Sequence, residues 1–306
     1  MNESKTVPIK DDVDFARLSE FMREMEAMYP DLRVFSVGES IRGREILAAR
    51  LGNPMAPTST LYVGAHHGME HITSAVLMRF INEYFQYRAE GRRMFGVGMD
   101  FIFERRAIYV VPMLNPDGVE LSLHGADEKS PLYERLLKMN GSGDFTHWQA
   151  NERGVDLNHN YNAGFVEYKR IEKERGIFGG CASGYSGEYP ESEPEVSALC
   201  GLIRTLEPNV ILTLHTQGEE IYCGGDYASK KTLGVGHLIA EMTGYTLAVP
   251  TGSAAYGGLT DWFVREYGKP SFTLECGRGK NPLPHSDFPK ISAGLRELLF
   301  SLPMLI

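Results

Sequence analysis

The densest group of potential metal ligands in this chain is the segment Gly-Ala-His-His-Gly-Met-Glu-His at 64–71, which holds three of its nine histidines. Within it, His67 and Glu70 are three residues apart, so in a helical turn their side chains would project to the same side. A histidine nitrogen and a carboxylate oxygen both suit zinc, and a hydrolytic zinc takes three protein ligands and a water molecule. The pair therefore predicts a zinc site that a distant residue completes.

His215 is the best candidate for the third ligand. It directly follows an apolar, β-rich run at 210–214, just as the histidine segment follows a similar run at 61–65. The carboxyl ends of the strands in an α/β sheet converge on the crevice where ligands bind. We therefore expect His67, Glu70 and His215 to bind one zinc ion per chain at one edge of the sheet.

A rival interpretation uses the same segment. His67-Gly-Met-Glu70-His71 also fits the His-x-x-Glu-His motif, in which both histidines bind zinc and the glutamate is the base. That motif needs one continuous helix, whereas Gly68 and the preceding strand favour a turn at His67. We therefore prefer Glu70 as a ligand, with His66 and His71 outside the first coordination sphere.

The pattern of apolar residues predicts an α/β layer architecture, because strands and helices alternate along the chain. A capping box, Ser192-x-x-Glu195, predicts the start of one helix. Two segments without periodicity, 140–150 and 176–190, are expected to form loops at a site. No linker is evident, so we expect one domain across 1–306. The predicted strands are 61–65, 107–113, 210–214 and 271–275, and the predicted helices are 15–28, 72–87, 193–206, 233–242, 261–266 and 291–299.

Composition excludes several classes of partner. The formal net charge of −9 disfavours nucleic acid, whose phosphates are bound by Lys and Arg. Neither the first dozen residues nor any later run is apolar enough for a signal-peptide core or a membrane span. Four cysteines without a C-x-x-C pair fit a reduced compartment. We therefore expect a cytoplasmic protein without a membrane partner, and the sequence leaves its oligomeric state open.

The motifs, taken in order from about Gly43 to Gly277, resemble those of the zinc carboxypeptidase family. This resemblance implies a mixed, twisted sheet of about eight strands sandwiched by helices. It also implies that Glu275 is the general base, and that Asp156 accepts the second ring N–H of a zinc-bound histidine. The matching motifs are His67-x-x-Glu70, Leu-Asn-Pro-Asp-Gly at 114–118, Gly-Val-Asp-Leu-Asn at 154–158, Leu-His at 214–215 and Phe-Thr-Leu-Glu at 272–275.

Three departures from the family pattern concern the substrate. The arginine that clamps a C-terminal carboxylate usually follows the asparagine of the substrate loop, Asn158, but His159 stands there. The arginine that stabilises the oxyanion is replaced by Gln149, with Arg153 as the other candidate. The family's substrate-contacting tyrosine is replaced by Ser253, and Tyr256 lies close enough to substitute. Trimming of free C-termini is therefore not the expected activity.

The segments 215–222 and 275–284 are similar to those of bacterial γ-D-glutamyl-meso-diaminopimelate peptidases, which cut peptidoglycan stem peptides. This likeness implies a peptidoglycan-derived peptide as substrate, whose carboxylates could be recognised by Arg278, Lys280 or Arg153 instead of a terminal clamp. The residues predicted to bind substrate are Asn158, His159, Tyr256 and Arg278. A carboxypeptidase or amide hydrolase acting on other C-terminal substrates is the alternative. An inactive zinc-binding module that recognises peptides is a third, although it would be expected to lack a ligand or the base.

Overall fold

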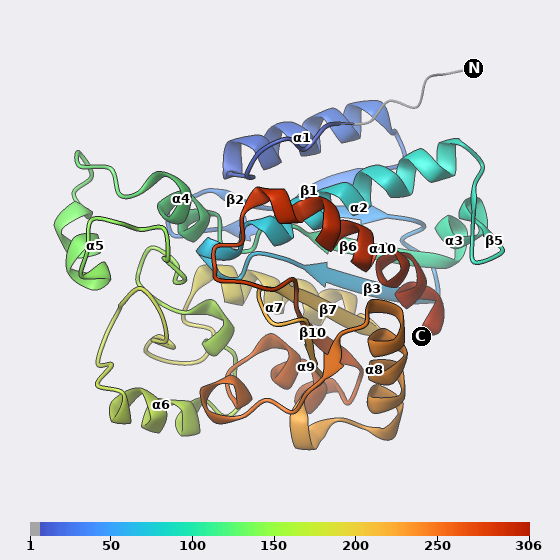
Figure 1. Ribbon diagram of the computed structural model, residues 1–306. Helices are drawn as coiled ribbons and strands as arrows, with labels where there is room; N and C mark the ends of the chain where they lie inside the picture. Colours follow the sequence, from blue (N-terminus) through green and yellow to red (C-terminus); the bar gives the residue numbers. More distant parts are fainter. Residues whose placement is uncertain (1–6) are drawn as a thin grey trace.

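The computed structural model describes residues 7–306, and its centre is an eight-stranded sheet with the order β1-β2-β6-β3-β7-β10-β8-β9 (Figure 1). A separate two-stranded hairpin, β4-β5, lies outside this sheet. The strands are β1 (Arg33–Glu39), β2 (Glu45–Leu51), β3 (Thr58–Val63), β4 (Arg93–Met94), β5 (Val97–Gly98), β6 (Arg106–Val111), β7 (Val210–His215), β8 (Glu220–Tyr222), β9 (Thr246–Leu247) and β10 (Ser271–Glu275).

The sheet is mixed, with a parallel centre. Strands β6, β3, β7 and β10 are parallel neighbours, whereas β1, β2 and β8 join antiparallel to their inner neighbours. Every residue of β7 is buried, because parallel strands are covered on both faces. The parallel centre therefore brings the carboxyl ends of β3, β7 and β10 to one edge.

Helices cover both faces of the sheet. One apolar cluster joins the sheet to α1, α2, α8 and α10, and a second joins the other face to α7 and α9. In Figure 1, α4, α5 and α6 gather beside one end of the sheet. The helices are α1 (Phe15–Met28), α2 (Ile72–Ala89), α3 (Met99–Arg105), α4 (Pro116–His124), α5 (Tyr133–Asn140), α6 (Phe165–Glu174), α7 (Pro194–Leu206), α8 (Lys230–Thr243), α9 (Leu259–Tyr267) and α10 (Phe288–Leu305).

The predicted strands and helices are all present, but the capping box is wrong. Helix α7 begins at Pro194 after the N-cap residue Glu193, which makes no side-chain cap hydrogen bond. The hydroxyl of Ser192 instead donates to Glu193 and accepts from Asn160 Nδ2 at 3.0 Å. Long-range contacts thus outcompete the local cap. Between residues 7 and 306, no helix is both long and apolar enough to cross a bilayer.

Candidate metal centre and reaction cavity

His67 and Glu70 lie on a tight turn between β3 and α2. His67 has an extended backbone (φ −104°, ψ 135°), and Gly68–Glu70 form a short 3-10 helix. A glycine is required at 68, because a Cβ there would lie 2.2 Å from the carbonyl oxygen of Gly118. The turn therefore packs directly against the first turn of α4, which fixes both side chains at the carboxyl end of β3.

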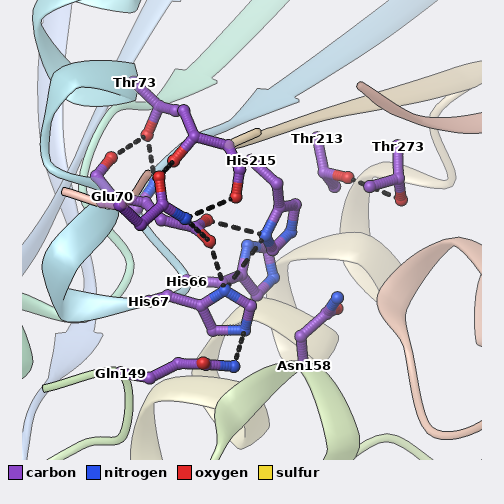
Figure 2. A network of polar contacts seen from close by, with 12 residues as sticks. His66, His67, Glu70, Thr73, Gln149, Asn158, Thr213, His215 and Thr273 are labelled. Carbon is purple, nitrogen blue, oxygen red and sulfur yellow. Dashed lines mark hydrogen bonds and ion pairs between the residues drawn. The ribbon is translucent and has the colours of Figure 1, made fainter. Parts of the chain in front are cut away.

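The side chains of His67, Glu70 and His215 converge on one point (Figure 2). His67 Nδ1 lies 3.0 Å from Glu70 Oε1, and His215 Nδ1 lies 3.0 Å from Glu70 Oε2. The two Nδ1 atoms are 3.3 Å apart, and all three residues are buried. The fold thus joins two adjacent parallel strands and one turn into a single cluster of ligand atoms.

This cluster fits a zinc ion. Ligand atoms at about 2.0–2.1 Å from a tetrahedral zinc are separated by about 3.3 Å, and the separations here are 3.0 to 3.3 Å. Two imidazole nitrogens that face each other at this distance repel through their lone pairs unless a proton or a cation lies between them. Two histidines and a glutamate also leave a fourth position for water, as in hydrolytic zinc sites.

The geometry does not support the rival motif with His71 as a ligand. His67 lies outside α2, and the buried Nδ1 of His71 faces Asp12 at 3.6 Å. In the described part of the chain, His71 does not belong to the cluster of ligand atoms. His66 stacks on His215, with ring centroids 5.1 Å apart. His66 therefore packs against a ligand candidate, and His71 faces away from the cluster.

The charges at the cluster favour a cation. Burial alone would raise the pKa of Glu70, but His67 and His215 lower it to about 2. Burial likewise opposes the charged form of His67, whereas the carboxylates of Glu70 and Asp156 raise its pKa well above the usual value. Two buried carboxylates thus stand beside the histidine nitrogens, where their negative charge would stabilise a divalent cation.

Asp156 orients His67. Its Oδ1 lies 3.2 Å from His67 Nε2, so an Nε2–H group would donate to it and leave the Nδ1 lone pair facing the cluster. Gln149 Nε2 lies 3.3 Å from His67 Nε2 (Figure 2). The same nitrogen donates to Asp156 Oδ2 at 2.8 Å. Gln149 thus holds Asp156 in place. Its contact with a developing oxyanion stays a prediction.

The motif Leu-Asn-Pro-Asp-Gly at 114–118 ties together the loops around the cluster. Asn115 Oδ1 accepts from the backbone N–H of Gly118 at 2.9 Å and caps α4. Its Nδ2 donates to the carbonyl oxygens of His66 at 3.0 Å and Ala150 at 3.1 Å. One amide therefore joins the turn before His67 to the loop after Gln149.

A cavity of about 130 Å³ opens beside the cluster, and His67 and Glu275 both line it. Glu275 ends β10, where the parallel register pairs it with His215. Burial raises the pKa of Glu275 to about 8, and the nearby carboxylate of Glu70 acts in the same direction. A cation bound at the cluster would lower this pKa and favour the ionised carboxylate that a general base needs.

Two of the four predicted substrate residues, Asn158 and His159, line this cavity. Asn158 Oδ1 accepts from the backbone N–H of Leu259 at 3.2 Å. His159 Nδ1 donates to the carbonyl oxygen of Tyr256 at 2.8 Å, and its ring stacks on Tyr168 with centroids 3.9 Å apart. Both side chains are therefore held in fixed orientations at the cavity wall.

The structure does not bring the other two substrate candidates to the cavity wall. The side chain of Tyr256 borders a neighbouring cavity with Ala163 and Glu167. Arg278 is 74% exposed and pairs with Glu219 at 2.5 Å. Their contacts with substrate stay predictions, as does that of Arg153, which pairs with Glu193.

Residues 18–297 match the family profile described as zinc carboxypeptidase, peptidase M14. The chain belongs to the zinc carboxypeptidase family. It is 31% identical over 281 residues to gamma-D-glutamyl-L-diamino acid endopeptidase 1 of Lysinibacillus sphaericus, covering 91% of this chain and 69% of the relative. It is also 31% identical over 280 residues to the uncharacterized protein YqgT of Bacillus subtilis, covering 91% and 73%. This family member is a metallopeptidase, and its substrates are peptides.

Solved structures confirm the predicted fold. Bovine thrombin-activatable fibrinolysis inhibitor, in complex with tick carboxypeptidase inhibitor, superposes with a TM-score of 0.69 at 18% identity, covering 99% of this chain and 96% of that one. The murein-tripeptide amidase MpaA of Escherichia coli O157 superposes with a TM-score of 0.54 at 19% identity, covering 88% and 91%. The mixed, helix-flanked sheet inferred from the sequence motifs is therefore correct.

The structure adds cavity residues that sequence reasoning missed, among them Thr260, Asp261 and Thr273. Thr273 Oγ1 lies 3.0 Å from Thr213 Oγ1 and 2.9 Å from Thr260 Oγ1 (Figure 2 shows the first pair). The signal for Thr273 was the alternation of polar and apolar residues in 271–275, which places it on the same face of β10 as Glu275. No sequence spacing identifies Asp261 as a residue of the cavity.

Proposed function

We propose that this metallopeptidase hydrolyses the amide bond between γ-D-glutamate and a diamino acid in peptidoglycan-derived peptides, using one zinc ion per chain held by His67, Glu70 and His215. The observation that carries the chemistry is the convergence of three buried side chains beside Glu275: the Nδ1 atoms of His67 and His215 lie 3.3 Å apart, and each lies 3.0 Å from one oxygen of Glu70. The substrate class is supported by the similarity to a relative named for that bond, along 91% of this chain.

Each group at the site would have a separate role in amide hydrolysis. Zinc, when bound, supplies Lewis acidity that polarises the scissile carbonyl and acidifies a water molecule. Glu275 takes the proton from that water and delivers it to the leaving amine. Asp156 holds His67 in the tautomer that ligation needs. The buried walls around these groups keep competing water away and strengthen the electrostatic interactions between them.

The C-terminal clamp of other family members is not reproduced here. His159 Nδ1 donates to a backbone carbonyl oxygen, so the neutral ring presents the lone pair of Nε2 at the other side. A lone pair repels a carboxylate, whereas an arginine fork binds it bidentately. His159 therefore does not replace the arginine as a bidentate clamp for a C-terminal carboxylate.

A substrate panel tests this proposal. Zinc-loaded protein is mixed with a γ-D-glutamyl-diaminopimelate tripeptide and, in parallel, with a hippuryl-type C-terminal substrate, and kcat/KM is measured for each. We expect the tripeptide to be cleaved faster, and activity to disappear with a chelator and return with zinc. Faster turnover of the hippuryl substrate would reject the substrate class, and activity that survives complete metal removal would reject the mechanism. The cytoplasmic location expected from the sequence stays a prediction.

A further inference from the structure

His215 lacks the kind of hydrogen-bond partner that holds the other histidine of the metal cluster. His67 Nε2 faces the carboxylate of Asp156 at 3.2 Å, whereas no group within residues 7–306 hydrogen-bonds to the buried Nε2 of His215. A metal-binding histidine is normally held through its second ring nitrogen, which fixes the direction of the ligating lone pair. The orientation of the His215 ring therefore depends on packing.

Two aromatic rings contact the ring of His215 (Figure 2). Its face stacks on His66, with ring centroids 5.1 Å apart and planes inclined by 28°. His67 meets it edge-on, with centroids 4.8 Å apart and an interplanar angle of 62°. Of these two neighbours, only His66 contributes no atom to the cluster of ligand candidates. The stacked ring of His66 therefore limits rotation of the His215 side chain without competing for the metal.

His66 is also joined to the substrate loop. Its side chain is fully buried, and its Nε2 lies 3.0 Å from the hydroxyl of Tyr161. Tyr161 is buried as well, follows the short 3-10 helix Leu157–His159 closely, and packs on Trp262 with ring centroids 6.0 Å apart. One side chain thus connects a metal-ligand candidate to the loop that carries the substrate candidates.

A histidine at position 66 is less favourable for stability than an apolar ring would be. Its Nδ1 is buried and has no hydrogen-bond partner in the part of the chain that the structure describes. A buried polar atom without a partner destabilises the native state, because its hydrogen bonds to water are lost and not replaced. Phenylalanine would fill the same place without that loss. The bond between His66 Nε2 and Tyr161 gives a reason for the histidine.

We propose that His66 is a positioning residue with two separable contacts. Its ring face fixes the orientation of His215 for metal binding, and its Nε2 fixes the substrate loop through Tyr161. This inference rests on the proposed function, because it takes His215 as a zinc ligand. It adds that the metal and the substrate loop are held in register by one side chain that binds neither the zinc ion nor the substrate.

Three variants separate the two contacts. His66→Ala removes both, whereas His66→Phe and Tyr161→Phe remove only the hydrogen bond. Zinc affinity is measured by chelator competition on the folded apo-protein. We expect His66→Ala to weaken zinc binding by about 10- to 100-fold, and both phenylalanine variants to stay within about threefold of the wild type. His66→Leu, which fills the space with a non-planar side chain, serves the same comparison if the alanine variant does not fold.

A spectroscopic measurement distinguishes positioning from a general loss of stability. The visible absorption bands of Co²⁺ bound in place of zinc depend on the geometry of its ligands. We expect these bands to shift in His66→Ala and to match the wild type in His66→Phe. Phe300→Ala, which removes a buried ring stacked on Tyr87 at 5.4 Å, is the matched control. It should lower the melting temperature and leave the bands and the zinc affinity unchanged.

Turnover of the γ-D-glutamyl-diaminopimelate tripeptide tests the hydrogen bond. We expect His66→Phe and Tyr161→Phe each to lower kcat/KM by about 2- to 10-fold, mainly through a higher KM, because the loop loses one anchor. The double variant should lose no more than either single variant, since both remove the same contact. Losses that multiply in the double variant would overturn the coupling.

The outcomes for His66 and for the proposed function are distinct. A wild-type zinc affinity in His66→Ala or His66→Leu would overturn the positioning role, as would an equal loss of affinity in His66→Phe. A wild-type protein that binds no zinc would instead reject the metal site of the proposed function. If the variants show the expected zinc affinities but the wild type does not cleave the tripeptide, the substrate class fails and the role of His66 at His215 stands.

Discussion

The two sides of the reaction cavity are built in opposite ways. On the metal side, His67, Glu70 and His215 contact one another at 3.0 to 3.3 Å and are held by buried strands and turns. On the substrate side, Asp261 and His159 Nε2 have no partner among the described residues, although both line the cavity. The proposed metal side thus consists of groups that pair with one another, whereas the proposed substrate side presents polar groups to the cavity.

This difference has a physical consequence. A cluster of mutually paired groups, once it binds a cation, can stabilise the fold, because metal bound only by the native state adds its binding free energy to folding. Unpaired polar groups in a cavity destabilise the fold slightly and are retained for what they bind. Substitutions on the metal side should therefore affect metal content and stability together, and those on the substrate side should affect specificity at little loss of stability.

The largest effect is expected from His215→Ala. This change removes one of three ligands, so we expect zinc content to fall well below one per chain and turnover to be lost. Metal analysis after dialysis, with a thermal melt, measures both. His71→Ala is the matched control and should retain metal and activity. The reverse pattern would revive the motif in which His67 and His71 bind the metal.

Glu275→Gln should separate chemistry from metal binding. The amide keeps the shape of the side chain but cannot accept the proton from water, so we expect kcat to fall by about 10²–10⁴-fold with zinc content unchanged. Turnover of the γ-glutamyl substrate and zinc stoichiometry are measured on the same preparation. Retention of more than a tenth of the wild-type activity would show that another group is the base.

Asp156→Asn should have an intermediate effect. The amide can no longer stabilise the charge that builds up on His67, so we expect a loss of about 10–100-fold in zinc affinity or activity. A competition titration against a zinc chelator measures affinity independently of turnover. Asp226→Asn, an exposed position in the short 3-10 helix Gly225–Tyr227, is the control. A loss of activity with unchanged zinc affinity would assign Asp156 to substrate binding instead.

A substitution at Glu195 should have the smallest effect, and it tests the buried hydrogen-bond network behind the substrate loop. Its oxygens accept from Ile41 N at 3.3 Å and Asn151 Nδ2 at 3.2 Å. Burial raises its pKa from 4.5 to about 7. A raised folded-state pKa stabilises the protein fully below pH 4.5, and this stability is lost as the pH rises through about 7.

Glu195→Gln should remove this pH dependence. Relative to wild type, the free energy of unfolding of the variant should increase by on the order of 1–3 kcal/mol between pH 4.5 and 8. Urea unfolding at several pH values provides the measurement, with the exposed Glu297→Gln as control. A constant difference across this range would mean that Glu195 is ionised throughout.

The parallel centre of the sheet could be predicted because its strands are short, buried segments rich in apolar residues, and the prediction for residues 271–275 matches the bounds of β10. The edge strands could not. Strand β1 has no fully buried residue, and β8 and β9 are three and two residues long. Such strands exist because a neighbour offers hydrogen bonds, and their own sequence gives little sign of this.

By itself, the sequence determined which residues could bind a metal, since His67, Glu70 and His215 follow buried strands whose carboxyl ends must meet. It also determined the family, through motifs spread over much of the chain. Only the tertiary structure decided that Gln149 holds Asp156, that Arg278 lies outside the cavity, and that Asp261 faces it unpaired. Spacing along the chain specifies local geometry, whereas pairing and burial depend on which distant segments the fold brings together.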